Sequence, residues 1–246
     1  MLKLVVSDLD GTLLPYGSDS VSHSVKSKIK ALTERGVIFA LASGRNYSEL
    51  IRLFSEFSEK AYFIAADGAY TVKSGRIIYS RAIPREELDF LVKQSAGAPL
   101  IFFGAERSYA HGTPPSSEIR SDTAFIKSAL DIPSGEKIFK AVKFGAPVKL
   151  PPYSGIRIHW DGRQIGVTEY VNRFANKGAA LSDLKIRLNV PESSTVVIGD
   201  MTNDLSLFKG AKHRIAVGDR CPELLELATE RAACGEEALA RILDEI

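Results

Sequence analysis

The sequence has little cysteine and no long apolar run, and both absences limit what the chain can be. Its two cysteines, Cys221 and Cys234, are too few for a disulfide framework or a cysteine metal cluster, and we expect both to be reduced thiols in a cytoplasm. No apolar segment approaches the roughly 20 residues that span a bilayer, so we expect no membrane association. The apolar stretch 1–6 is short and leads into Asp8 and Asp10, which is not the pattern of a signal peptide.

The chain also lacks a strong excess of charge of either sign. The formal net charge of its 246 residues is +2, which gives no argument for nucleic acid or an anionic membrane as a partner. Hydrophobic residues make up 45% and charged residues 25%, as in ordinary globular proteins. The length suffices for one large domain or two modest ones, and nothing in the sequence indicates an oligomeric state.

Apolar runs rich in branched residues alternate with segments of helical spacing in the first and last thirds of the chain. We expect strands at residues 2–7, 37–42, 61–66, 195–198 and 214–217. We expect helices at residues 25–32, 47–57, 177–188, 205–209, 222–229 and 236–246. Continuous apolar strands separated by amphipathic helices predict an α/β fold, a doubly wound parallel sheet covered on both faces.

The middle of the chain has a different pattern. Ser74-Gly75 and Asp161-Gly162 each separate two short β-forming runs, so each predicts the turn of a β-hairpin. Antiparallel signals flanked by parallel ones predict a small α+β domain inserted into the doubly wound one. We therefore expect a core domain formed by residues 1–82 and 176–246, and an inserted domain at 83–175.

The strongest candidate site follows the first expected strand, in the segment Asp8-Leu9-Asp10-Gly11-Thr12. Ligands of open parallel sheets bind beyond the carboxyl ends of the strands, so Asp8 and Asp10 would both reach that crevice. One carboxylate can attack phosphorus as a nucleophile, and the other can exchange a proton with the leaving oxygen and later with water. The competing interpretation is a simple turn, which Asp and Gly favour anyway.

Two further segments also follow expected strands. Ser43-Gly44-Arg45 combines a hydroxyl, a glycine backbone and a helix start, as anion sites do, although Ser-Gly turns are common. Asp200 would stand at the same sheet edge as Asp8, and hard oxygen ligands of this kind suit Mg²⁺. Asn203 and Asp204 would lie close by, or either could simply cap the next helix.

Lys177 stands at the start of an expected helix. A cation there is unfavourable to the helix dipole unless a phosphate or a carboxylate lies nearby. The alternative interpretation is a solvated surface lysine.

Together these segments resemble the haloacid dehalogenase (HAD) superfamily, specifically its Cof-type phosphatases. The matching segments are Asp8-Leu9-Asp10-Gly11-Thr12, Ser43-Gly44-Arg45, Lys177-Gly178 and Gly199-Asp200-Met201-Thr202-Asn203-Asp204. Asp67-Gly68-Ala69 is similar too, although Asn is more usual than Asp67. Gly218-Asp219-Arg220 departs from the usual Gly-Asn-Ala. The resemblance covers both core segments, and the insert only in position and size.

The resemblance implies an enzyme, a Mg²⁺-dependent phosphatase that hydrolyses a small phosphorylated metabolite, such as a sugar phosphate, through an aspartyl-phosphate on Asp8. Asp8 would be the nucleophile and a metal ligand, and Asp10 the acid/base, with its backbone carbonyl on the metal. Asp200 would complete the metal site.

The resemblance also implies residues around this centre. Ser43, Gly44, Lys177 and Asn203 would hold the phosphate. Thr12 would steady the loop, and Asp204 would orient Lys177 or a metal-bound water. The insert would be a cap that closes over the site and selects substrates. The candidate contacts in the cap are Arg157, His159, Trp160, Arg163, Glu169 and Arg173.

Two other functions stay open at this point. A phosphomutase of the same superfamily, similar to a phosphomannomutase, could share every core residue and return the phosphoryl group to a second sugar hydroxyl. A non-enzymatic phospho-acceptor domain also carries acidic residues, a hydroxyl and a lysine at strand ends. Such a domain is about one ordinary domain in size and lacks the insert. A phosphatase assay with and without Mg²⁺ discriminates among the three.

Overall fold

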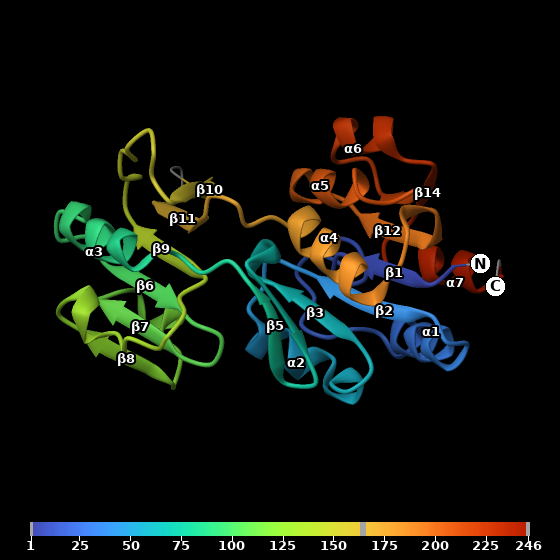
Figure 1. Ribbon diagram of the computed structural model, residues 1–246, viewed down its shortest axis with the longest axis horizontal. Helices are drawn as coiled ribbons and strands as arrows, with labels where there is room; N and C mark the ends of the chain where they lie inside the picture. Colours follow the sequence, from blue (N-terminus) through green and yellow to red (C-terminus); the bar gives the residue numbers. More distant parts are fainter. Residues whose placement is uncertain (1, 163–165, 245–246) are drawn as a thin grey trace. The chain divides into compact units, whose positions relative to one another are not determined.

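The computed structural model describes residues 2–162 and 166–244, and the chain forms two compact units (Figure 1). The core unit comprises Met1–Tyr79 and Asn176–Ile246, and the inserted unit comprises Ser80–Ala175. Each unit has its own sheet and its own apolar core. The predicted fold class, a doubly wound α/β fold with an inserted α+β unit, is confirmed.

The core unit is built on an eight-stranded sheet of order β14-β13-β12-β1-β2-β3-β4-β5. The strands are β1 (Leu4–Ser7), β2 (Ile38–Ala42), β3 (Tyr62–Ala65), β4 (Tyr70–Lys73), β5 (Arg76–Ser80), β12 (Thr195–Gly199), β13 (His213–Val217) and β14 (Glu230–Ala232). All neighbours from β14 to β3 are parallel, and β4 turns back antiparallel to β3.

The central strand β1 decides where a ligand can bind. The chain passes from β1 to β2 on one side and later returns in β12 on the other. Strands β1 and β12 are paired so that Ser7 lies opposite Ile198, and both strands end at the same sheet edge. Parallel sheets bind ligands at such a reversal of strand order, so this edge is where a site is expected.

Among the described residues of the core unit, six α-helices accompany the sheet: α1 (His23–Glu34), α2 (Tyr47–Leu53), α4 (Lys177–Leu188), α5 (Leu205–Phe208), α6 (Pro222–Leu227) and α7 (Glu237–Asp244). Buried apolar residues of α4, α5 and α6, such as Leu181, Phe208 and Leu224, pack in one cluster with Val6 and Val197 of the sheet. Figure 1 shows these three helices beside one another. Burying a leucine or phenylalanine side chain stabilises a fold by about 1.5–3 kcal/mol, so this cluster fixes the helices that carry site residues.

The sequence misses two features of the core unit. The helix expected at 47–57 is divided, because α2 ends at Leu53 and a separate 3-10 turn, Ser55–Phe57, follows. Strand β14 was not predicted at all. It is three residues long and contains Glu230 and Arg231, so it has no apolar periodicity that could reveal it.

The described part of the inserted unit contains a six-stranded sheet of order β10-β11-β9-β6-β7-β8 and one α-helix, α3 (Arg85–Gln94). Its strands are β6 (Leu100–Phe103), β7 (Ser108–His111), β8 (Thr123–Ile126), β9 (Lys140–Phe144), β10 (Ile156–Gly162) and β11 (Val167–Asn172). All described neighbours are antiparallel except β7 and β8.

The turn predicted at Asp161-Gly162 is wrong, although the hairpin itself is present. Both residues belong to β10, where Asp161 pairs with Thr168 and Gly162 pairs with Val167. Pairing with β11 continues through Gly162, beyond the point that the turn signal indicated, and an irregularity between Ile158 and Trp160 shifts the register within β10.

Two further observations concern the whole chain. No helix in the described ranges is long and apolar enough to cross a membrane. Cys221 is buried, Cys234 is exposed, and both are free thiols.

Candidate active site

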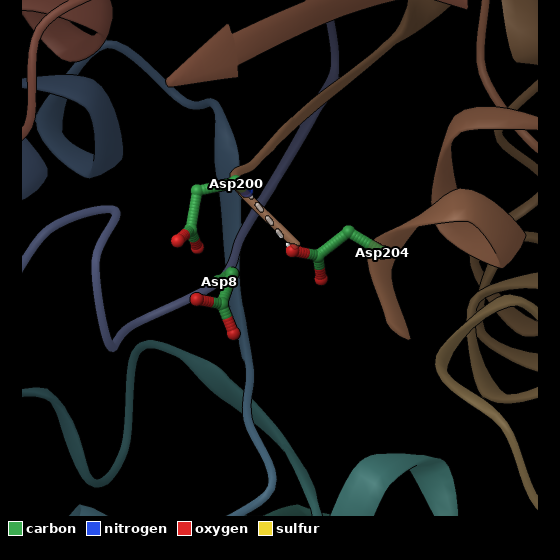
Figure 2. Close-up of side chains that lie close together, drawn as sticks. All are labelled: Asp8, Asp200 and Asp204. Carbon is green, nitrogen blue, oxygen red and sulfur yellow. Dashed lines mark hydrogen bonds between the residues drawn. The ribbon is translucent and has the colours of Figure 1, made fainter. Parts of the chain in front are cut away.

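Three buried carboxylates meet at the edge where β1 and β12 end. Asp8 directly follows β1, Asp200 directly follows β12, and Asp204 closes the 3-10 turn Thr202–Asp204. Oxygen atoms from the three carboxylates all lie within 4.8 Å of one another. Figure 2 shows the three side chains converging, with a hydrogen bond from the backbone amide of Asp200 to the carboxylate of Asp204. Such a group of hard oxygen ligands can hold a divalent cation.

Lys177 supplies the positive charge at this cluster. Its Nζ donates hydrogen bonds to Asp8 Oδ1 at 2.6 Å and to Asp204 Oδ1 at 2.7 Å, and the lysine side chain is completely buried. Burial alone would lower the pKa of Lys177, but attraction to Asp204 and Asp8 outweighs it and raises this pKa. The lysine is therefore a fixed cation rather than the solvated surface residue that was the alternative.

The cluster carries more negative charge than Lys177 can neutralise. Burial raises the pKa of Asp8 well above its ordinary value, and the attraction of Lys177 only partly opposes that effect. Burial also raises the pKa of Asp200. Three carboxylates beside one ammonium leave a surplus that a bound divalent cation would offset. The donor set therefore fits Mg²⁺.

The chain turns sharply after Asp8 because of Gly11, whose φ is +84°. A Cβ at this position would lie 2.3 Å from Oδ2 of Asp200 and 2.4 Å from the ring of Tyr16. A side chain there would be excluded both by the left-handed backbone and by these two neighbours. Gly11 thus lets the segment after β1 pack directly against Asp200.

Hydrogen bonds hold both oxygens of Asp200. Thr12 donates from Oγ1 to Asp200 Oδ1 at 3.0 Å, and Tyr16 donates from its hydroxyl to Oδ2 at 2.6 Å. Asp204 Oδ2 accepts from the backbone amides of Asp200 and Met201, which fixes the loop behind the cluster. Sequence reasoning missed Tyr16, because a half-exposed tyrosine in a turn carries no signal of its own.

Asp10 lies in the same loop, but its carboxylate is not one of the three that cluster. Instead it accepts a pair of hydrogen bonds from Arg45, with Nε 2.9 Å from Oδ2 and Nη2 2.5 Å from Oδ1. Both side chains remain about one third exposed. The sequence placed Arg45 in a candidate segment but gave it no role, since nothing in the spacing shows that it reaches Asp10.

Asp67 connects the segment Ser43-Gly44-Arg45, which follows β2, to Asn203. The backbone amide of Asp67 donates to the carbonyl of Ser43, and Asn203 Nδ2 donates to Asp67 Oδ1 at 2.9 Å. Gly44 lies so close to Asp67 that a Cβ on the glycine would be 2.8 Å from Oδ2. Asp67 adopts φ 53° and ψ 38°, a left-handed conformation that Asn and Asp tolerate better than most residues. Ser43, Gly44 and Asn203 are thus brought together through Asp67.

In the inserted unit, four of the candidate cap residues have partners within that unit, and two of them, Arg157 and His159, lie against each other, with Nη1 3.4 Å from Nδ1. Arg157 donates to the carbonyl of Ala175 at 2.8 Å, and Arg173 donates to the carbonyl of Ser154 at 3.2 Å. Glu169 pairs with Lys140 at 3.4 Å. Arg163 lies outside the described residues, and only the backbone of Trp160 is described.

The inserted unit also contains an open cavity of about 800 Å³ that the sequence did not indicate. Residues 146–152 and β10 line most of it, and Arg157 and Arg173 are among its polar groups. The cavity lies entirely within this unit, so two of the cap candidates border a hollow large enough for a small molecule.

Comparison with known proteins identifies the family. The model of the haloacid dehalogenase-like hydrolases matches residues 5–242. This chain belongs to that family. The HAD resemblance and the expectation of a hydrolytic enzyme are therefore confirmed.

Named relatives of this HAD-like hydrolase cover nearly its whole length. Phosphoglycolate phosphatase of Metallosphaera sedula is 27% identical over 93% of this chain and 91% of its own. HMP-PP phosphatase of Yersinia enterocolitica is 22% identical over 99% and 94%. The solved structure of the HAD subclass IIB sugar phosphatase BT4131 matches with a TM-score of 0.74 at 20% identity, covering 99% of this chain and 95% of that one. That structure supports the fold.

Proposed function

We propose that this HAD-like hydrolase is a Mg²⁺-dependent phosphatase that acts through an aspartyl-phosphate on Asp8. The observation that carries the proposal is the buried contact between Asp8 and Lys177 beside Asp200 and Asp204. A nucleophilic carboxylate needs neighbouring positive charge before it can approach a phosphate dianion. Lys177 supplies one fixed positive charge. The three clustered carboxylates would add more by binding a metal cation.

The metal would be held by the carboxylates of Asp8 and Asp200 and the backbone carbonyl of Asp10. Bound there, Mg²⁺ would offset negative charge on the phosphoryl group and on Asp8. Thr12 keeps Asp200 in place, and Asp204 orients Lys177 through its 2.7 Å hydrogen bond.

In the first step, a carboxylate oxygen of Asp8 attacks phosphorus, and the bond from phosphorus to the leaving oxygen breaks. For this step Asp10 must leave its pair with Arg45 and carry a proton, which it gives to that oxygen, so that the alcohol departs neutral. In the second step, Asp10 takes a proton from water, the water oxygen attacks phosphorus, and the bond to Asp8 breaks. Inorganic phosphate leaves and Asp8 is regenerated.

The phosphoryl oxygens would be held by Ser43, the Gly44 amide, Lys177 and Asn203. Asp67 supports this arrangement, because it contacts the Ser43–Gly44 segment and accepts a hydrogen bond from Asn203. Each of these groups acts on the phosphoryl group and not on the remainder of the substrate, so they would serve any phosphate monoester.

The substrate would be a small phosphorylated metabolite. The relatives are named for different compounds, namely phosphoglycolate, HMP-PP and sugar phosphate, so the family resemblance supports a class of substrate rather than one compound. In this proposal the core unit performs the chemistry, and the inserted unit is a cap that contacts the leaving group.

The test measures release of inorganic phosphate from an aryl phosphate and from a panel of phosphorylated metabolites, after chelation and again after Mg²⁺ is added. We expect no turnover in chelator, full recovery with Mg²⁺, and poor recovery with Ca²⁺, which prefers more ligands and longer bonds. Full activity in excess chelator would contradict the metal site. Phosphoryl transfer to a second hydroxyl without net phosphate release would identify a phosphomutase, and stable phosphorylation without turnover a phospho-acceptor domain.

A further inference from the structure

Tyr16 is a residue that the proposed chemistry does not use, yet it touches the proposed metal site. It follows the segment Asp8-Leu9-Asp10-Gly11-Thr12 in a turn closed by a hydrogen bond from the Ser18 amide to the Pro15 carbonyl. About half of the residue is exposed to solvent. Its hydroxyl nevertheless reaches inward and donates to Asp200 Oδ2 at 2.6 Å.

The ring of Tyr16 is held from two different loops. It packs so closely on Gly11 that a Cβ there would lie 2.4 Å from a ring carbon. The guanidinium of Arg220, in the loop after β13, lies 4.5 Å from the ring centroid. A cation over an aromatic ring is worth about 0.5–1 kcal/mol at an exposed site.

The hydroxyl of Tyr16 completes the restraint on Asp200. Thr12 already donates to Oδ1, so the carboxylate cannot rotate about its Cβ–Cγ bond without breaking one of two hydrogen bonds. Each carboxylate oxygen can accept more than one partner, so both keep capacity for a cation. Asp200 is thus oriented before any ion binds.

We propose that Tyr16 is a positioning residue that acts through Asp200 to set the affinity of this site for Mg²⁺ and its preference for Mg²⁺ over Ca²⁺. The inference rests on the proposed function, which makes Asp200 a metal ligand. Mg²⁺ demands near-ideal octahedral geometry with short bonds, whereas Ca²⁺ accepts irregular and bidentate carboxylates. An oriented carboxylate therefore favours the smaller ion, and a carboxylate free to turn favours it less.

The experiment is calorimetric titration of the metal-free protein with Mg²⁺ and, separately, with Ca²⁺. Tyr16→Phe removes the hydroxyl and keeps the ring, and Arg220→Ala removes the cation beside the ring. Tyr153→Phe is the matched control, because Tyr153 lies in the inserted unit and is 93% exposed. Thermal unfolding of each variant without metal reports whether the fold is intact.

We expect Tyr16→Phe to weaken Mg²⁺ binding about 10-fold or more, as loss of outer hydrogen bonds does at other metal sites. Ca²⁺ binding should change much less, so the ratio of the two affinities falls. Arg220→Ala should weaken Mg²⁺ binding by a smaller factor, and Tyr153→Phe should match the wild type.

Three results would overturn the inference. Unchanged or tighter Mg²⁺ binding by Tyr16→Phe would remove Tyr16 from the site. Equal losses for Mg²⁺ and Ca²⁺ would refute the effect on ion preference. A wild-type protein that binds neither ion would refute the proposed metal site, and the inference with it. The wild-type titration thus separates failure of the proposed function from failure of the role of Tyr16.

Discussion

Lys177 Nζ lies 2.6 Å from Asp8 Oδ1, although 169 positions separate the two residues in the chain. The contact exists because Asp8 directly follows a central strand and Lys177 begins the helix that re-enters the core unit. It places a fixed cation on the proposed nucleophile itself.

Lys177→Ala should depress turnover of every phosphate monoester alike. The lysine contacts Asp8, which in the proposed mechanism attacks the phosphoryl group that all substrates share. We expect kcat/KM to fall about 10²- to 10³-fold, as when one fixed donor to a developing charge is removed. Lys185→Ala is the control, because Lys185 lies on the same helix but donates to Glu192 and the Gly210 carbonyl. A loss confined to large substrates would contradict this role.

Asp8→Asn should abolish the covalent step. The amide keeps the size of the side chain but cannot attack phosphorus. Hydrolysis of an aryl phosphate should fall by several orders of magnitude. Wild-type turnover in this variant would exclude the aspartyl-phosphate mechanism. Detection of a phosphorylated protein by mass spectrometry, in the wild type and not in the variant, gives an independent measurement.

The same substitution should change how the stability of the metal-free protein depends on pH. The folded-state pKa of Asp8 is raised above its ordinary value of 3.8, so the native state binds this proton more tightly than the unfolded state. Stability from this group is therefore lost as the pH rises from 3.8 through the raised pKa. Asp8→Asn has no such carboxyl group and does not lose stability in this way. As the pH rises across this range, the urea unfolding midpoint of the variant in chelator should therefore increase relative to that of the wild type. A constant difference between the two at all pH values would contradict the assignment.

Substitutions in the inserted unit should alter choice of substrate and spare the chemistry. Arg173→Ala and His159→Ala should change the ranking of sugar and nucleotide phosphates. A minimal substrate such as acetyl phosphate should stay within about tenfold, or roughly 1.4 kcal/mol of transition-state binding. If kcat/KM for acetyl phosphate falls as severely in these variants as in Lys177→Ala, the inserted unit takes part in catalysis. It is then not a cap that only selects substrates.

Gly68→Ala should destabilise the core unit. The glycine has a φ of +85°, and a Cβ there would lie 2.2 Å from the carbonyl oxygen of Asn176. Gly36→Ala is the matched control, because its φ is +79° and no atom lies within 4 Å of its Cβ position. The control should lose about 1 kcal/mol from backbone strain alone, and Gly68→Ala distinctly more, measured by urea unfolding. Equal losses would show that the backbone shifts freely at Gly68.

The sequence was sufficient for features that depend on local pattern. Apolar runs located the parallel strands other than β14, and helical spacing located α4 at Lys177–Leu188, because tertiary packing there agrees with local preference. The convergence of Asp8 and Asp200 followed from one rule, that parallel strands end at the same sheet edge.

Contacts between loops could not be predicted in this way. The reach of Arg45 to Asp10, of Asn203 to Asp67 and of Tyr16 to Asp200 depends on how each loop turns after its strand. The spacing of apolar residues in the sequence does not predict the conformation of such a loop. Strand β14 was not predicted for a related reason. A three-residue edge strand is defined by its pairing with its neighbour β13 and not by its own composition.

The central place of β1 also has a consequence for synthesis on the ribosome. β1 pairs with β2 on one side, and its partner on the other, β12, begins only at Thr195. Between the two, the ribosome makes the whole of Ser80–Ala175, a unit with its own core that can fold as soon as it emerges. Throughout that interval β1 has one unpaired edge, which is the kind of edge that recruits other strands. An incomplete chain that ends before Thr195 therefore leaves this side of β1 open to pairing with other strands.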